Sequence, residues 1–333
     1  MTTDNYLTKV AGDGVAVDDL LRAADDSLSL GHGLAQPLAL GLPVLDVHIG
    51  HGLVPGDLAV LAGAQGVGKT TLALQVARNV AAAGSPATYV CFEHDAEQLV
   101  ERLLVMEANL VVGDAAPTLQ DVRERLSHSG AQSLKARVRD LPGMVAAMDR
   151  VRDYGSQLHI VSARGDVTGL PEIRVAAAWH DRLGLVVVDY LQKVRSDQVD
   201  EDQRVARIAT SLKDFALETG QAVLAVSALD RAGLEAKRIR ARHLKGSVTL
   251  AYEADLILLM HHKYDVVARE KLVYDLARAQ DLHHWLVVSL EKNRHGDDRL
   301  DLAFRKRLSR GHIDPHGHIE DDALVDERIH IDH

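Results

Sequence analysis

The chain has 333 residues, a formal net charge of −10, an apolar fraction of 47% and only 4% aromatic residues. This length supports one large α/β domain, or two modest ones, with a core built mainly from Ala, Val, Leu and Ile. The single cysteine, Cys91, excludes an internal disulfide and argues against a cysteine-rich metal site. We expect a cytoplasmic protein, because the sequence has neither an apolar run of about 18 residues that could span a membrane nor the apolar segment of a signal peptide.

The first predicted element is a short amphipathic helix over residues 15–30, which Gly31 can end. A Gly- and Pro-spaced linker follows over 31–43, so the apolar face of this helix has no partner nearby in the sequence. We expect the face to pack on the main domain or on a neighbouring subunit. The predicted organisation is an N-terminal helix and linker over 1–44, a main domain over 45–310, and an acidic, His-rich tail over 311–333.

In the main domain, short apolar runs alternate with helical stretches, which predicts a largely parallel sheet with helices on both faces. Residues 113–156 are predicted to form a polar, helical insertion, and the tail after Arg310 to be loosely ordered and to bind metals only weakly. The predicted strands are 57–62, 88–92, 158–161, 183–189, 222–226 and 255–260, followed by a hairpin of 285–292 and 300–304. The predicted helices are 69–83, 95–108, 170–182 and 204–219.

The strongest motif is Gly63-Ala64-Gln65-Gly66-Val67-Gly68-Lys69-Thr70, which matches G-x-x-x-x-G-K-[ST] in full between a predicted strand and a predicted helix. Its glycines let backbone N–H groups point at phosphate oxygens, and the helix N-terminus adds a positive dipole end. Lys69 would reach the β/γ-phosphates of ATP, and Thr70 would ligate Mg²⁺. A Gly-rich turn without a ligand is the alternative. The predicted nucleotide-binding residues are Gly63, Gly66, Val67, Gly68, Lys69, Thr70, Thr71 and Asp189.

Two other predicted strands lead into carboxylates, Asp189 and Glu93. Because the carboxyl ends of parallel strands meet at the edge where ligands bind, both acids are expected near the phosphate loop. Asp189 would hold Mg²⁺ together with Thr70, and Glu93 would orient and polarise the attacking water. The alternatives are that Asp189 caps a turn and that Glu93 belongs to the start of the next helix.

Three segments also carry a family likeness. They are Phe92-Glu93 followed by Ala96-Glu97-Gln98-Leu99, then Val188-Asp189-Tyr190-Leu191-Gln192, then Lys292-Asn293-Arg294-His295-Gly296. They resemble, in order, the segment after the second strand, the Walker B motif and the C-terminal Lys-x-Arg-x-Gly motif of the DnaB-type replicative helicases. The resemblance is to the RecA-like ATPase domain of that family and runs from about Ala39 to Phe304.

The resemblance implies a RecA-like P-loop fold and an ATP-hydrolysing DNA helicase that forms a homo-oligomeric, hexameric ring on single-stranded DNA. It implies that Lys69, Thr70 and Asp189 bind Mg-ATP and that Glu93 is the catalytic carboxylate. Lys292 and Arg294 are implied to act in trans on the ATP of the neighbouring subunit, with a solvated hairpin tip as the alternative. The helix at 15–30 corresponds to the family's linker helix, which docks on the next protomer.

The sequence departs from the family pattern at three points. Only about 40 residues precede the main domain, where the family has a separate helical domain that binds primase. Ala228 stands where the family has a glutamine that senses the γ-phosphate. The loop after Asp189 faces DNA in the family, and acids there would weaken a grip on phosphates. Those acids are Asp197, Asp200, Glu201 and Asp202.

A basic run after Ser227 is the candidate DNA contact. In a ring it would form the second loop of the central channel, and several copies would make a positive funnel for single-stranded DNA. The alternative is a solvated helix face. The predicted DNA-binding residues are Arg231, Lys237, Arg238, Arg240, Arg242 and Lys245.

Three functions therefore stay open, and we expect the first. It is a ring-forming motor on single-stranded DNA, with a loader or another protein as a further partner. The second is an ATPase switch, related to the KaiC or RadA type, that remodels or loads a protein without processive unwinding. Ala228 and the acidic loop favour this switch. The third is a nucleotide-binding scaffold with negligible turnover, against which the intact Lys69, Asp189 and Glu93 argue.

Overall fold

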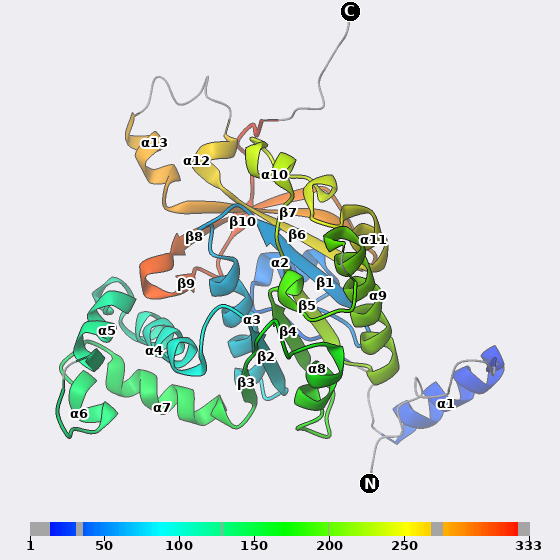
Figure 1. Cartoon of the computed structure of the whole chain (residues 1–333), viewed down its shortest axis with the longest axis horizontal. Coiled ribbons are helices and arrows are strands. Elements are labelled where there is room, and N and C mark those ends of the chain that lie inside the picture. Colours follow the sequence, from blue (N-terminus) through cyan, green and yellow to red (C-terminus); the bar gives the residue numbers. More distant parts are fainter. Residues whose placement is uncertain (1–13, 31–35, 128, 199, 268–275, 326–333) are drawn as a thin grey trace, which may run out of the picture.

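The computed structural model describes residues 14–30, 36–127, 129–198, 200–267 and 276–325, and Figure 1 shows one sheet at its centre. The strand order is β10-β8-β7-β6-β1-β5-β4-β2-β3, and β9 pairs with β8 outside this path. Neighbours from β6 to β3 are parallel, and β7, β8 and β10 extend the sheet by antiparallel pairing. The predicted α/β fold with its C-terminal hairpin is confirmed.

The predicted strands are all present with small shifts at their ends. They are β1 (Leu58–Gly63), β2 (Ala87–Cys91), β3 (Leu158–Ser162), β4 (Leu185–Asp189), β5 (Ala222–Ser227), β6 (Leu256–His262), β7 (Trp285–Asn293) and β8 (Leu300–Arg307). The predicted helices are α3 (Lys69–Ala82), α4 (Ala96–Val112), α8 (Leu170–Ala177) and α9 (Glu201–Thr219), of which α8 ends before the predicted residue 182. The helix α9 begins before the predicted start because the Asp200 carboxylate accepts a hydrogen bond from the backbone N–H of Gln203 and caps it.

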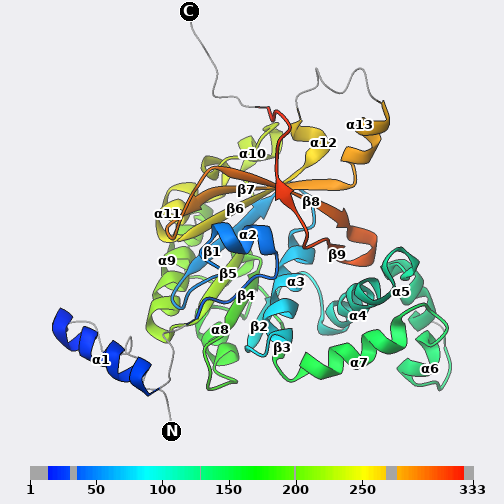
Figure 2. The same cartoon turned by 180° about the vertical axis from the view of Figure 1, so that it is seen from behind.

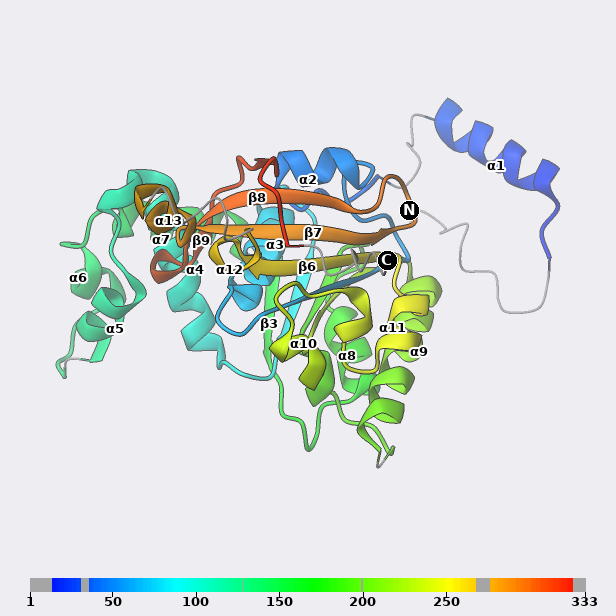
Figure 3. The same ribbon diagram turned by 90° about the horizontal axis from the view of Figure 1, so that it is seen from above.

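The central strands β1, β5, β4 and β2 are buried on both faces, as their continuous apolar sequences predict. Along β1, Ala59 and Leu61 belong to the core under α3 and α2 (Pro43–His48), whereas Val60 and Ala62 belong to the core under α8, α9 and α11 (Ser247–Glu253). This alternation follows from the period of two along a strand. Figures 2 and 3 show these helices on opposite sides of the sheet.

The predicted insertion is a small helical unit beside the sheet. It contains α5 (Leu119–Ser127), α6 (Leu134–Val138) and α7 (Met144–Gly155), which pack on the second half of α4. Its core is separate from the two sheet cores, and includes Val122, Val138, Met144 and Ala147. The expected helical insertion at 113–156 is confirmed.

The packed unit extends past both predicted boundaries. Leu40 and Leu42, which lie before the boundary predicted at residue 45, are buried in the main core. On the other side, β9 (His312–Ile313) and β10 (His318–Ile319) join the sheet. The prediction of a loosely ordered tail is wrong for 312–325, because strand pairing holds this segment. Residues 326–333 lie outside the described residues.

The N-terminal helix α1 (Val17–Ser29) confirms the predicted helix, although Gly31 and the linker residues 31–35 lie outside the described residues. It buries none of its residues, and Figure 3 shows it apart from the sheet and its helices. Its exposed apolar side chains are Val17, Leu20, Leu21 and Leu28. In the described part of the chain, no helix is long and apolar enough to cross a bilayer.

Candidate active site

The phosphate loop joins β1 to α3 at the carboxyl edge of the parallel strands. Gly66 and Gly68 have φ values of 74° and 108°, which side chains other than glycine rarely adopt. A Cβ at Gly68 would also come 2.7 Å from the Leu308 side chain. The Lys69 ammonium group donates to the carbonyl oxygens of Gly63 and Ala64, each at 3.0 Å. The loop thus curls around its own lysine, which faces the cavity beside it.

That cavity of about 550 Å³ gathers most of the predicted nucleotide site. Asp189 pairs with Cys91 across β4 and β2, so the two carboxylates that follow these strands meet at one edge. Glu93 precedes α4, whose N-cap is Asp95, so the alternative that Glu93 belongs to that helix is wrong. The predicted residues that line the cavity are Gly63, Gly66, Gly68, Lys69, Thr70, Thr71, Glu93 and Asp189.

The charges in the cavity are mutually compensating. Burial lowers the pKa of Lys69, and the negative charges of Asp189 and Glu93 oppose this shift. The Asp189 carboxylate and the Thr70 hydroxyl offer oxygen ligands that suit Mg²⁺, and the Lys69 ammonium group suits the negative charge of a polyphosphate. Val67 is the one predicted nucleotide-binding residue that does not line the cavity, and its side chain is buried in the core under α3. Its backbone N–H stays a predicted phosphate contact.

Tyr89 is a site residue that the sequence analysis missed. It lies on β2, fully buried, and its hydroxyl donates to Oδ2 of Asp189 at 2.8 Å. Burial raises the pKa of Tyr89, and the charge of Asp189 adds to this effect, so the phenol stays protonated and fixes the carboxylate. A phenol hydroxyl on a strand predicted to be buried is the signal that could have revealed it, because such a hydroxyl needs a hydrogen-bond partner.

Two more residues were missed at the same edge. Arg102 of α4 lines the cavity, and its Nε is buried without a hydrogen-bond partner among the described residues. Gln192 follows the Walker B strand, and its side-chain amide donates to Ser227 Oγ at 2.9 Å and accepts from the backbone N–H of Ala228 at 2.9 Å. The two strand ends are therefore joined by Gln192, although Ala228 has no polar side chain.

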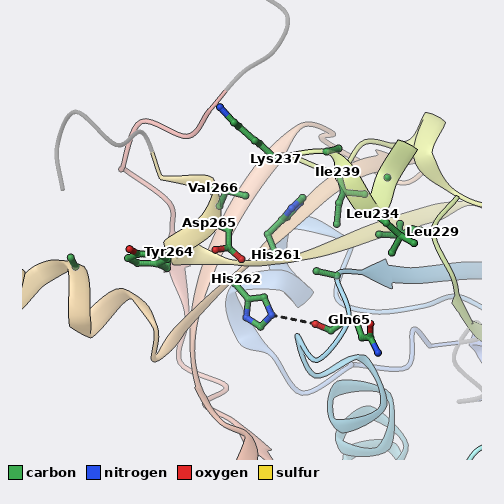
Figure 4. A pocket seen from close by; sticks show the side chains of 14 residues that line it. Gln65, Leu229, Leu234, Lys237, Ile239, His261, His262, Tyr264, Asp265 and Val266 are labelled. Carbon is green, nitrogen blue, oxygen red and sulfur yellow. Dashed lines mark hydrogen bonds between the residues drawn. The ribbon is translucent and has the colours of Figure 1, made fainter. Parts of the chain in front are cut away.

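A second, larger hollow of about 940 Å³ adjoins the phosphate loop at Gln65 (Figure 4). The carbonyl of Gln65 lies 3.5 Å from Nε2 of His262, and Lys306 Nζ lies 2.7 Å from Nδ1 of the same ring. His261 also lines the hollow and is buried, and its Nε2 has no hydrogen-bond partner among the described residues. Burial lowers the pKa of His261 to about 3, with further repulsion from Arg238 and Arg240.

Lys292 and Arg294 lie at the opposite edge of the sheet. Because β7 is antiparallel to β6, Lys292 pairs with Ile257 near the start of β6, whereas Gly63 pairs with Met260 near its end. Lys292 Nζ donates to the carbonyls of Ala251 and Tyr252 at 2.7 and 3.2 Å. The alternative of a freely solvated hairpin tip does not fit Lys292, which is held at the end of α11.

Arg294 is held at the same place. Its guanidinium donates to Oδ1 of Asp255 at 2.9 Å and to the carbonyl of Tyr252 at 2.7 Å. The other oxygen of Asp255 accepts from the backbone N–H of Leu58 and from Lys213, at 2.8 and 2.7 Å. Within one chain, neither Lys292 nor Arg294 lines the cavity at the phosphate loop.

The basic run does not form the predicted funnel of free cations. Arg238 and Arg240 are buried and pair with Asp301 and Glu291, so the prediction that they face DNA is wrong. Lys245 binds Glu201 at 2.7 Å, which joins the basic loop to the acidic one. Arg231 is exposed beside Glu235 in the short helix α10 (Arg231–Glu235), and Lys237 and Arg242 are exposed as well.

The acidic loop after Asp189 is largely a helix start. Asp200 caps α9, and Glu201 and Asp202 lie in its first turn, where negative charge stabilises a helix. Among the described residues, the one close group of three side chains that could ligate a metal is Glu320, Asp321 and Asp322, without a histidine. Two of these carboxylates neutralise buried Lys263, at 2.9 and 3.1 Å, which accounts for the cluster without an ion.

A family model described as the DnaB-like helicase C terminal domain matches residues 38–311, most of the chain. The chain belongs to this family. It is 30% identical over 222 residues to the replicative DNA helicase DnaB of Nostoc sp., covering 66% of this chain and 23% of that protein. It is 27% identical over 292 residues to the DnaB of Mycoplasma genitalium, covering 84% and 57%. The chain thus spans less than two thirds of either relative.

Solved structures agree on the fold. One of them, described as an ATPase domain, superposes with a TM-score of 0.70 at 18% identity, covering 91% of this chain and 99% of that domain. A DnaB-like replicative helicase, described with its interactions with primase, gives 0.67 at 17% identity and covers 91% and 67%. A KaiC-like protein from Pyrococcus horikoshii gives 0.54 at 14% identity, covering 86% and 100%. The RecA-like core expected from the sequence is confirmed.

Proposed function

We propose that this member of the DnaB-like family is an ATP-hydrolysing, ring-forming motor that acts on single-stranded DNA. The observation that carries the proposal is the separation of two half-sites. Lys69, Glu93 and Asp189 surround one cavity, while Lys292 and Arg294 lie at the other edge of the same sheet. A complete site then needs the second half from a neighbouring copy, which makes hydrolysis depend on assembly.

Each half supplies different groups. Bound Mg²⁺ would neutralise phosphate charge, with Thr70 and Asp189 as its protein ligands. Lys69 and the N–H groups of the phosphate loop would bind the β- and γ-phosphates, and Glu93 would orient water toward the terminal phosphorus. Arg294 and Lys292 of the next copy would stabilise the charge that develops on the transferred phosphoryl group.

The helix α1 supports assembly into a homo-oligomer, for which we propose a hexamer. Val17 and Leu21 are exposed on it at 72% and 65%, and no residue of α1 is buried within the described chain. Burial of an apolar helix face against a neighbouring subunit would stabilise the ring. A loader or another protein partner would then act on the assembled ring.

For DNA contact, the exposed cations of the basic loop are the remaining candidates. Lys237 and Arg242 are exposed, and Arg231 has a solvent-screened partner that a phosphate could displace. Lys245 is half-buried on Glu201 and would have to exchange that partner for a phosphate. The proposed DNA contact is therefore narrower than the six residues expected from the sequence.

The second candidate is an ATPase switch that remodels a protein partner. Ala228 favours it because its side chain cannot contact a γ-phosphate, and the burial of Arg238 and Arg240 leaves fewer cations for DNA. ATP hydrolysis measured at low salt, with and without single-stranded DNA, separates the two. We expect DNA to stimulate hydrolysis and added salt to abolish the stimulation. A rate of ATP hydrolysis that single-stranded DNA does not change would favour the switch.

A further inference from the structure

Two ion pairs, Arg240–Glu291 and Arg238–Asp301, connect the loop over 236–245 to the β7–β8 hairpin. Arg240 donates to Oε1 of Glu291 at 2.7 Å, and the backbone N–H of Ala241 donates to Oε2 of the same carboxylate at 3.2 Å. The side chains of Arg240 and Glu291 are only 11% and 8% exposed. Arg238 donates to both oxygens of Asp301 on β8, at 2.8 and 2.6 Å. The loop and the hairpin therefore share a buried charged contact.

Glu291 occupies an irregular position in the sheet. In the β6–β7 ladder, Ile257 pairs with Lys292 and the next residue, Leu258, pairs with Leu290. Glu291 is therefore the extra residue of a β-bulge. A bulge re-aims the side chains around it, and Lys292 is the next residue along the strand. The face of the sheet to which Lys292 points is therefore set by whether Glu291 stays in the bulge.

The same loop reaches the two basic residues by a second route. Its chain continues into α11, whose last carbonyls, at Ala251 and Tyr252, accept hydrogen bonds from Lys292. Tyr252 also accepts from Arg294. Residues 240–253 thus hold the Lys292–Arg294 pair from both sides, through the bulge and through the helix end.

We propose that Arg240 is a positioning residue for Lys292, one of the two proposed trans-acting cations. Its guanidinium neutralises the Glu291 carboxylate and so keeps the bulge in register. Without it, a buried unpaired carboxylate would force a rearrangement, and a slip of one residue would turn Lys292 to the other face of the sheet. The proposal rests on the proposed function of Lys292, and it gives Arg240 a role other than binding DNA.

A double-mutant cycle tests this role, using Arg240→Met, Lys292→Ala and the double variant in the full chain. We expect Arg240→Met to lower kcat for ATP by about 10²-fold, because a misplacement of about 1 Å costs that much. The Kd of a fluorescent ATP analogue should stay unchanged, since the phosphate loop is intact. In the Lys292→Ala background, Arg240→Met should lower kcat no further.

The experiment distinguishes a failure of the positioning role of Arg240 from a failure of the trans role of Lys292. If Lys292→Ala lowers kcat and the effect of Arg240→Met multiplies with it, the positioning role is overturned while the proposed function stands. If Lys292→Ala keeps full kcat, the trans role of Lys292 fails, and the positioning role with it. Arg240→Lys keeps the charge and guards against misfolding, and we expect it to restore part of kcat. Arg174→Met, which removes a more exposed ion pair with Glu218, is the matched control and should leave kcat unchanged.

Discussion

The two edges of the sheet hold their cations in different ways. At the carboxyl edge, Lys69 is held by carbonyls five and six residues away, within a single loop. At the amino edge, Lys292 and Arg294 are held by groups about 40 residues away, on α11 and at Asp255. The first arrangement is local and preformed. The second depends on tertiary structure, and we expect it to be the easier one to disturb from a distance.

The comparison is tested most strongly by Arg294→Ala. If the amino edge completes a neighbour's site, this change should lower kcat by about 10³-fold, because a trans arginine stabilises transition-state charge. Mixing this variant with Lys69→Ala subunits should recover activity, since some interfaces then pair an intact phosphate loop with an intact Arg294. Mixing Lys69→Ala with Glu93→Gln is the control and should recover none. No recovery in the first mixture would place Arg294 outside the neighbour's site.

At the carboxyl edge, Glu93→Gln should lower kcat by about 10²- to 10³-fold, because the amide no longer polarises water. Nucleotide binding, followed by the Kd of a fluorescent analogue, should change little. Glu97→Gln alters an exposed acid in the first turn of α4 and is the matched control. Full turnover by Glu93→Gln would remove Glu93 from the catalytic role.

The burial of Arg238 and Arg240 can be tested through the pKa of their neighbour His261. The pKa of His261 is lowered to about 3 in the fold, against 6.5 for the free side chain. Its contribution to stability is therefore complete above about pH 6.5 and is lost as the pH falls toward 3, by up to about 1.4 kcal/mol per pH unit. Urea unfolding between pH 4 and 7.5 measures this slope. His261→Leu should flatten it, and an unchanged slope would refute the assignment.

A smaller effect is expected from Tyr89→Phe, which removes the hydrogen bond to Asp189 while keeping the ring. We expect the Mg²⁺ concentration for half-maximal ATPase activity to rise by about tenfold, as for the loss of one hydrogen bond to a charged group. Tyr154→Phe, which alters another buried phenol outside the cavity, is the control. Equal Mg²⁺ requirements in both variants would mean that Tyr89 serves packing alone.

The smallest effect concerns Lys237, an exposed cation of the basic loop. If it contacts a phosphate, Lys237→Ala should reduce the slope of log K against log salt for single-stranded DNA by about one. Fluorescence anisotropy with a labelled oligonucleotide across a salt series measures the slope. Lys135→Ala, on the exposed surface of α6, should leave it unchanged. Equal slopes for both variants would remove Lys237 from the DNA contact.

The sequence predicted most of the residues that line the cavity at the phosphate loop because the parts of the loop are local. Loop, lysine and helix start are contiguous, and Asp189 and Glu93 follow apolar strands whose parallel pairing brings their ends together. The basic loop was misjudged for the opposite reason. Arg238 and Arg240 find their acids 63 and 51 residues further on, and no periodicity marks such pairs. The pairing of Tyr89 with Asp189, 100 residues further on, is equally unmarked in the sequence, although the polar tip of Tyr89 itself is visible there.

The burial of Cys91 makes site-specific labelling of the proposed assembly possible. It is the single thiol of the chain, it is buried at the end of β2, and burial raises its pKa. A buried protonated thiol reacts slowly with maleimides. A cysteine introduced on the exposed polar face of α1, such as at Asp26, would therefore carry a fluorophore at one defined place without removal of the native residue. Energy transfer between labelled copies would then report how α1 meets its neighbour as ATP is consumed.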